Sequence, residues 1–297
     1  MSEILKRNPT DKQINAVTTL RKQIRTYVAV MDKTIFGAEP TNEGALSHNF
    51  FMFMGQSMDR SGRFPPGHST RLMHDLNHFT IARGFIETFN LTPSRTDLAL
   101  IARAQQRIVR STLQELRYTP RAVGLKMSVA ETVSAFNVVG EITGSTDIAT
   151  TTVGAGFKVV SHEDILFRMV ENLLHNSRNE FVSIRREDGE FAGEITVDAR
   201  KTNDATTLEV IDNGRGIENY LRKIDLKTDE PEIPLRAITE KRLEAIANGR
   251  IGEGMNGNGL VIVGSLAALS GAEAFIRNPR FNPGRGAIIK IRFPNAA

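Results

Sequence analysis

The stretch HEDILFRMVENLLHNS, residues 162–177, decides the fold of the C-terminal part of the chain. Its apolar residues recur every three or four positions, the spacing of a helix with one buried side. They are Ile165, Leu166, Met169, Val170, Leu173 and Leu174. Asn172 and Asn176 lie four positions apart, so a helix presents both carboxamides on one face. Such a pair either faces solvent or serves a partner such as Mg²⁺ bound to phosphates, because Mg²⁺ prefers oxygen ligands.

Strand patterns follow this helix along the chain. The segments EITVDAR (194–200), TLEVID (207–212) and AIIKIRF (287–293) alternate apolar and polar residues, as half-buried strands do. GLVIVGSLAALSG (259–271) is typical of a helix, with Gly271 as its C-terminal cap. Helices mixed with a sheet in this way predict a two-layer α/β sandwich for residues 121–297.

Two glycine-containing segments are candidate ligand contacts. Asp212 ends a predicted strand and is followed by Gly214 and Gly216, which allow a flat ligand to approach while the carboxylate accepts from an exocyclic amine such as that of adenine. Gly257 and Gly259 lead into a predicted helix, whose first N–H groups suit a phosphate. Taken singly, the first segment is also a common turn, and the second is also a loop without a ligand.

Residues 67–120 predict a helical hairpin. Leu72, Leu76 and Phe79 follow one stripe, NLTPS (90–94) breaks the helix, and a second apolar stripe ends before Pro120. Two helices alone cannot bury a stripe on each, so we expect two hairpins to pair in a dimeric four-helix bundle.

Residues 1–66 form an N-terminal helical region of unknown role. Apolar positions from Ile14 to Met31 recur at steps of three or four, and the run FFMFM (50–54) indicates core or an interface patch. The region either extends the bundle, receives a signal from a partner or binds a small ligand.

Composition excludes several classes of protein. The charge is 38 − 34, or +4, and there is no Trp and only three Tyr, so we expect no nucleic acid partner. The absence of Cys excludes disulfides and thiolate metal sites. No apolar run reaches the roughly 18 residues of a membrane span, and the start lacks a secretory pattern, so we expect a cytoplasmic protein without membrane insertion.

The order of these pieces carries a family resemblance. An Asn-bearing helix, a strand with D-x-G-x-G, a glycine loop with a helix and a G-x-G strand resemble the ATP-binding fold of histidine kinases, gyrase, Hsp90 and MutL. Within the hairpin, His74-Asp75-Leu76-Asn77-His78 resembles the phospho-acceptor box of sensor histidine kinases, nearest the variant H-D-F-N-N. The resemblance covers about residues 68–297 and implies an α+β chain: N-terminal helices, a dimeric hairpin bundle, then an ATP-binding sandwich.

The resemblance implies roles for the nucleotide residues. Asn176 would hold Mg²⁺ with Asn172 supporting it, and Asp212 would bind the adenine amine, with Gly214 and Gly216 making room for the base. Gly257 and Gly259 would contact the phosphates of ATP. The segment from about 218 to 256 would be the lid over ATP.

It also implies roles in the acceptor box. His74 would be the phosphorylated histidine, and Asp75 would accept the N–H of its other ring nitrogen. His78 lies one turn further on the same face. It would position a water that dephosphorylates the partner protein, or it is a surface histidine.

Three positions depart from the family pattern. Ser177 replaces an Ala, Asn179 stands where a Lys is common, and Val261 replaces a loop glycine. The changes bear on the affinity for ATP more than on the fold.

The expected function is therefore a cytoplasmic, homodimeric histidine kinase of a two-component system, with ATP and Mg²⁺ as cofactors. It would pass the phosphoryl group to an aspartate in the receiver domain of a response regulator, and it would also act as a phosphatase on that regulator if His78 has the first of its two roles. The alternative is a histidine phosphotransfer protein or adaptor with a degenerate ATP-binding domain. An ATPase clamp of the Hsp90 or MutL type is disfavoured because those proteins place the ATP domain first.

Overall fold

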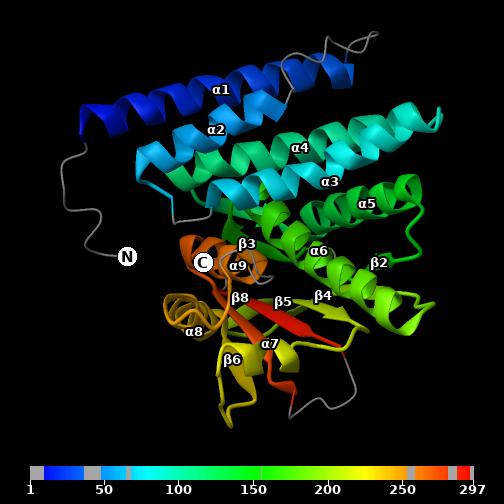
Figure 1. Ribbon diagram of the computed structural model, residues 1–297, viewed down its shortest axis with the longest axis vertical. Coiled ribbons are helices and arrows are strands. Elements are labelled where there is room, and N and C mark those ends of the chain that lie inside the picture. The colour runs from blue at the N-terminus through cyan, green and yellow to red at the C-terminus, as the bar shows by residue number, and fades with distance from the viewer. Residues whose placement is uncertain are drawn as a thin grey trace.

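The computed structural model describes residues 10–36, 48–64, 68–154, 156–252, 258–279 and 286–294. Figure 1 shows stacked layers: N-terminal helices on the outside, further helices in the middle, and a β-sheet. The helices are α1 (Asp11–Phe36), α2 (His48–Ser61), α3 (His68–Thr88), α4 (Arg95–Leu116), α5 (Leu125–Thr143), α6 (Glu163–Asp188), α7 (Glu218–Lys223), α8 (Leu235–Ala247) and α9 (Asn258–Leu269). The strands are β1 (Arg121–Gly124), β2 (Ile148–Thr151), β3 (Lys158–Ser161), β4 (Glu194–Lys201), β5 (Ala205–Asp212), β6 (Glu232–Pro234), β7 (Glu273–Arg277) and β8 (Ile288–Pro294).

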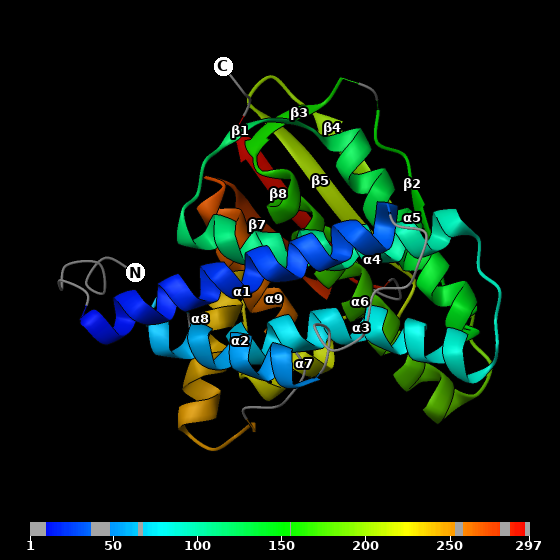
Figure 2. The same ribbon diagram turned by 90° about the horizontal axis from the view of Figure 1, so that it is seen from above.

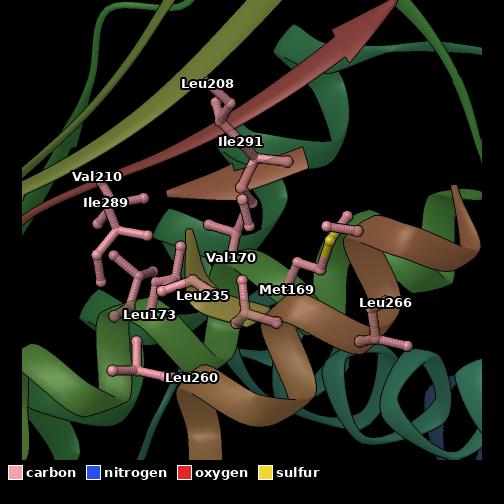
Figure 3. Close-up of a cluster of buried hydrophobic side chains, with 14 of the residues drawn as sticks. Met169, Val170, Leu173, Leu208, Val210, Leu235, Leu260, Leu266, Ile289 and Ile291 are labelled. Carbon is pink, nitrogen blue, oxygen red and sulfur yellow. The ribbon is translucent and has the colours of Figure 1, made fainter. Parts of the chain in front are cut away.

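The sheet and the middle helices form the predicted sandwich. Six strands pair in the order β2-β4-β5-β8-β7-β6, of which β2 and β4 are parallel and the other pairs antiparallel. β1 and β3 form a separate antiparallel pair. Figure 3 shows side chains of α6, α8 and α9 meeting those of β5 and β8 in the core, among them Met169, Leu173, Leu266, Leu208 and Ile291. The predicted α+β class is confirmed.

Helix α6 carries the Asn pair and extends well beyond the stretch that predicts it. The side chain of His162 caps its start by accepting from the Asp164 N–H at 3.2 Å. Acidic residues fill its first turn and arginines its last turn, which complements the helix dipole. The helix ends at Gly189, whose φ of 93° is the left-handed conformation that glycine adopts readily.

A second hydrophobic core lies between the N-terminal helices and the sandwich. Figure 2 shows α1 lying along α4 and α2 along α3. Each of the six helices from α1 through α6 contributes residues to this core, among them Leu20, Met54, Leu76, Ile108 and Phe167. The hairpin α3–α4 therefore buries its apolar stripes within one chain.

This packing changes the argument for a dimer. We expected a second hairpin to cover the stripes, because two helices cannot cover each other fully. Here α1, α2, α5 and α6 cover them instead. A homodimer is therefore not required for burial and stays a prediction.

Two further segments differ from expectation. Most of the segment predicted as a lid is built into the sandwich: β6 pairs with β7, and Leu221, Ile233, Leu235 and Ile238 are core residues. Residues 253–256 of that segment lie outside the described residues. In α2, Met54 and Met58 are buried as a core interpretation requires, whereas Phe53 is 57% exposed.

Candidate functional site

Asp212, the last residue of β5, is held by three hydrogen bonds to its carboxylate. Its carboxylate accepts from Ser177 Oγ at 2.9 Å and from the N–H groups of Gly214 and Ala287, each at 3.0 Å. Burial raises the pKa of this carboxyl group. Because a carboxylate offers about four acceptor positions, one remains for an amine of a ligand.

Glycines allow the chain to close around Asp212. A Cβ on Gly286 would lie 2.1 Å from the Asp212 carbonyl oxygen, and a Cβ on Gly214 would lie 3.1 Å from its Oδ1. Gly216 has a φ of 76°, in the left-handed region. Gly214 thus has a close contact with Asp212 itself, besides its expected role of making room for a base.

Asn176 and Gly259 come together as the resemblance implies. A Cβ on Gly259 would lie 2.6 Å from Asn176 Oδ1, so only glycine lets the first turn of α9 approach this carboxamide. Asn176 Nδ2 is buried and donates no hydrogen bond to any described residue. Buried donors rarely stay unpaired, so this nitrogen indicates an acceptor such as a phosphate or water oxygen. Gly257 lies outside the described residues.

Asn176 and the residues around it fit Mg²⁺ only when the ion is part of a complex with a nucleotide. Within the described ranges no cluster of three or more His, Cys, Asp or Glu is suited to a metal ion. Asn176 offers one oxygen ligand, and Mg²⁺ commonly takes one or two protein ligands beside phosphate oxygens and water.

Asn172 does not share this position. Its side chain is completely buried under α3, where Oδ1 accepts from Arg71 Nε at 2.9 Å and Nδ2 lies 3.2 Å from Asp75 Oδ2. Nδ2 also donates to the Arg168 carbonyl at 3.0 Å. In this conformation Asn172 binds the hairpin rather than supporting Asn176.

Asp75 is the centre of a buried polar latch, the group Arg71, Asp75, Glu115, Arg168 and Asn172. Its carboxylate lies 2.6 Å from Arg71 Nε and 3.3 Å from Arg168 Nε. Arg168, also completely buried, donates from Nη1 to Glu115 of α4 at 2.6 Å. The latch therefore joins both hairpin helices to α6.

The expected contact between Asp75 and His74 is absent. Both residues are described, and no hydrogen bond joins them, because Asp75 points inward while its neighbour on the helix is exposed. The arginines and Asn172, rather than the His74 ring, hold this carboxylate.

His74 has the state that a nucleophile needs. Its side chain is exposed on α3, and partial burial together with the charge of Arg71 lowers its pKa below the usual 6.5. The ring is therefore neutral at pH 7, and a neutral imidazole has a free lone pair.

Three imidazoles connect this residue to α6. The His74 and His78 ring centroids lie 4.7 Å apart with an edge contact, and His78 stacks on His175 at 3.5 Å. His175 directly precedes Asn176. His78 is not a surface histidine, because its ring stacks on His175 and its Nε2 is buried. This burial, followed by the charges of His74 and Arg71, lowers its pKa to about 3.

This row of rings predicts a pH dependence of stability. The folded chain keeps His78 neutral, whereas the unfolded chain protonates it below pH 6.5, so its contribution is complete above pH 6.5 and declines as the pH falls toward 3. From pH 7 to 5 we expect a loss of up to about 2 kcal/mol from this group. His78→Phe keeps an aromatic ring against His175 and does not titrate, so urea unfolding at the two pH values should show a smaller loss. An equal loss in both proteins would contradict the role of His78.

Sequence reasoning missed several residues of the site. Arg71 lies four positions before Asp75, and Arg168 lies four before Asn172, so their spacing alone allowed helical pairs. Ser177, noted only as a departure, donates to Asp212. Gly286 received no role from the sequence, yet it approaches Asp212 closely.

Comparisons with known proteins relate the C-terminal part of the chain to one family. Residues 161–297 match the family described as histidine kinase-, DNA gyrase B-, and HSP90-like ATPase. A search of curated proteins found no match. In the described ranges, no helix combines the length and the apolar character that a bilayer span requires.

Several solved structures show distant likeness. A mycobacterial sensor histidine kinase, MprB, has 17% identity and a TM-score of 0.38 over 59% of this chain and 97% of its own. The ATP-binding domain of PrrB from Mycobacterium tuberculosis has 16% identity and a TM-score of 0.39, covering 60% and 98%. The Acinetobacter baumannii histidine kinase AdeS has 12% identity and a TM-score of 0.41, covering 93% and 96%. The family match, rather than these likenesses, relates residues 161–297 of the chain to the histidine kinase-, DNA gyrase B- and HSP90-like ATPases.

Proposed function

We propose that the chain is a histidine kinase that transfers the γ-phosphoryl group of ATP to His74. The observation that carries this proposal is the docking of the acceptor helix α3 on α6, the helix of Asn176. The exposed, neutral ring of His74 contacts His78, which stacks on the residue directly before Asn176.

The transfer forms one bond and breaks another. A ring nitrogen of His74 attacks the γ-phosphorus, an N–P bond forms, and the bond to the β–γ bridging oxygen breaks, so ADP leaves. The other ring N–H then loses its proton. That proton goes to solvent, because Asp75 is committed to arginines and the low pKa of His78 makes it a poor base.

The sandwich would bind and orient the nucleotide. Asp212 would accept from the adenine amine through its remaining lone pair, and Asn176 and the start of α9 at Gly259 would face the phosphates. Mg²⁺, when bound, would be held by Asn176 and phosphate oxygens and would offset charge on the β- and γ-phosphates.

The later steps follow from the chemistry of the product. A phosphoimidazole is labile and suits transfer to a carboxylate, so we propose an aspartate of a response-regulator receiver domain as the next acceptor. A homodimer, a cytoplasmic location and phosphatase activity toward the regulator belong to the same proposal.

Incubation with γ-labelled ATP and Mg²⁺ tests the kinase assignment. We expect label on the protein that is stable to alkali and lost in acid, as for an N–P bond. A folded wild-type chain that binds ATP and acquires no such label would overturn the proposal.

The latch further supports transfer within one chain. Arg71, Asp75 and His78 of α3 all bind residues of the same chain's α6. We therefore expect a mixture of His74→Gln and Asn176→Asp chains to stay unlabelled, since the first lacks the acceptor and the second lacks the phosphate-facing carboxamide. Recovery of label to a substantial part of the wild-type amount would show transfer between two chains.

One observation favours the adaptor as second candidate. Asn172, a nucleotide residue by resemblance, is committed to Arg71 and Asp75. An adaptor would bind no nucleotide, so calorimetry with MgATP separates the two functions.

A further inference from the structure

A second candidate site lies at the start of α6, beside α4. A cleft of about 620 Å³ lies between α4, α5, β1 and the start of α6. None of the residues assigned to the nucleotide or to phosphoryl transfer lines it. The volume is within the range of small-molecule sites, roughly 300–1,000 Å³.

The walls of this cleft are strongly charged. Arg103, Arg107 and Arg110 follow one side of α4, at spacings of three and four residues, and Arg121 comes from β1. Three carboxylates face them: Glu131 of α5, and Glu163 and Asp164 of α6. The formal charge of this set is therefore +1, from four arginines and three carboxylates.

Arg107 forms ion pairs with all three carboxylates of the cleft. Arg107 lies 2.6 Å from Glu131, 3.3 Å from Asp164 and 3.6 Å from Glu163. It ties α4 to both neighbouring helices, as a structural ion-pair group does. Arg121 shares Glu163, at 3.2 Å.

Two arginines of the cleft form no close ion pair, although the charge of Arg110 also acts on the Asp164 carboxylate. Neither Arg103 nor Arg110 forms an ion pair with any residue in the described ranges. The cleft also contains the first turn of the 26-residue helix α6, where Glu163 and Asp164 already offset the partial positive charge of the helix dipole. The unpaired cations and the concave shape both favour an anion of small size.

We propose that this cleft binds a small multivalent anion, with carboxylate or phosphate groups paired to Arg103 and Arg110. The planar guanidinium fork matches both groups in a two-point contact. The claim concerns binding and does not depend on the kinase proposal. If that proposal also holds, the ligand would touch the acceptor hairpin through α4 and the ATP domain through α6.

Calorimetry on the full chain tests the site, with citrate as the carboxylate probe and pyrophosphate as the phosphate probe, both without Mg²⁺. We expect at least one probe to bind with a Kd below about 10 mM, and Arg110→Gln and Arg103→Gln each to weaken it about tenfold. Arg236→Gln is the matched control, because Arg236 lies on α8 and, among the residues that the structure describes, pairs with the exposed Glu240 alone. The affinity of Arg236→Gln for either probe should equal that of the wild type.

Two results would overturn the proposal. The first is no heat of binding from either probe at low ionic strength, and the second is equal affinity in the wild type and both cleft variants. Thermal unfolding of each variant confirms that its fold is intact.

Discussion

Replacing His74 by Gln should abolish phosphorylation of the chain by ATP. Gln keeps the size and polarity of the exposed position but offers no nucleophilic ring nitrogen, so we expect no acid-labile label above background. His78→Gln is the matched control, because it lies one turn further on the same helix and should still be labelled at His74. Mass spectrometry of peptides prepared at alkaline pH then locates the phosphoryl group.

The control also makes this prediction decisive. If the His74→Gln chain is labelled as strongly as the wild type, the acceptor lies elsewhere and the docking geometry has no catalytic meaning. If His78→Gln alone loses the label, His78 is the acceptor. Unchanged binding of MgATP in both variants assigns the losses to transfer rather than to nucleotide affinity.

Replacing Asp75 by Ala should destabilise the fold by about 3–5 kcal/mol, the range for breaking a buried ion pair. The side chain is completely buried, and its removal leaves the guanidinium groups of Arg71 and Arg168 without their shared carboxylate. Urea unfolding measures the change. Glu240→Ala, which removes one partner of an exposed pair on α8, should change stability by less than about 0.5 kcal/mol.

A double substitution separates lost charge pairing from lost volume. Asp75→Leu with Arg168→Met replaces one buried charged pair by apolar side chains, and such exchanges are often neutral. We expect the double variant to be more stable than Asp75→Ala, although Glu115 then keeps only His68 as a partner. A loss below about 1 kcal/mol in Asp75→Ala would show that the latch does not hold the hairpin on α6.

Local patterns predicted the framework correctly. The stripe of α6, the alternation of β4, β5 and β8, and the hairpin break at 90–94 are all properties of neighbouring residues. Helix α5 was missed for a physical reason. Ala135 and Val139 belong to the second hydrophobic core, under the N-terminal helices, while Val133 and Phe136 belong to the core of the sandwich. The helix is therefore apolar on two sides, and its sequence lacks a clear periodicity of apolar residues.

Contacts between distant segments could not be predicted in this way. The bond from Arg71 to Asn172 joins residues 101 positions apart, and nothing in either local sequence specifies it. The resemblance assigned Asn172 and Asp75 by position, yet the two bind each other in the latch. Asn176 and Gly259 lie together in the structure, and Ser177, the residue after Asn176, donates to Asp212. Strand ends and helix starts at one edge of a sandwich meet where the topology brings them together, and the roles of these residues toward a nucleotide stay a prediction.

The cover that α1 and α2 form over the hairpin bears on how this chain can be divided. A fragment starting at residue 67 would uncover Leu72, Leu76, Ile101 and Ile108, all of which are almost fully buried in the intact chain. Such a fragment has an exposed hydrophobic surface. Dimerisation of the fragment through that surface would say little about how intact chains associate. Expression trials aimed at oligomeric state should therefore keep the first two helices.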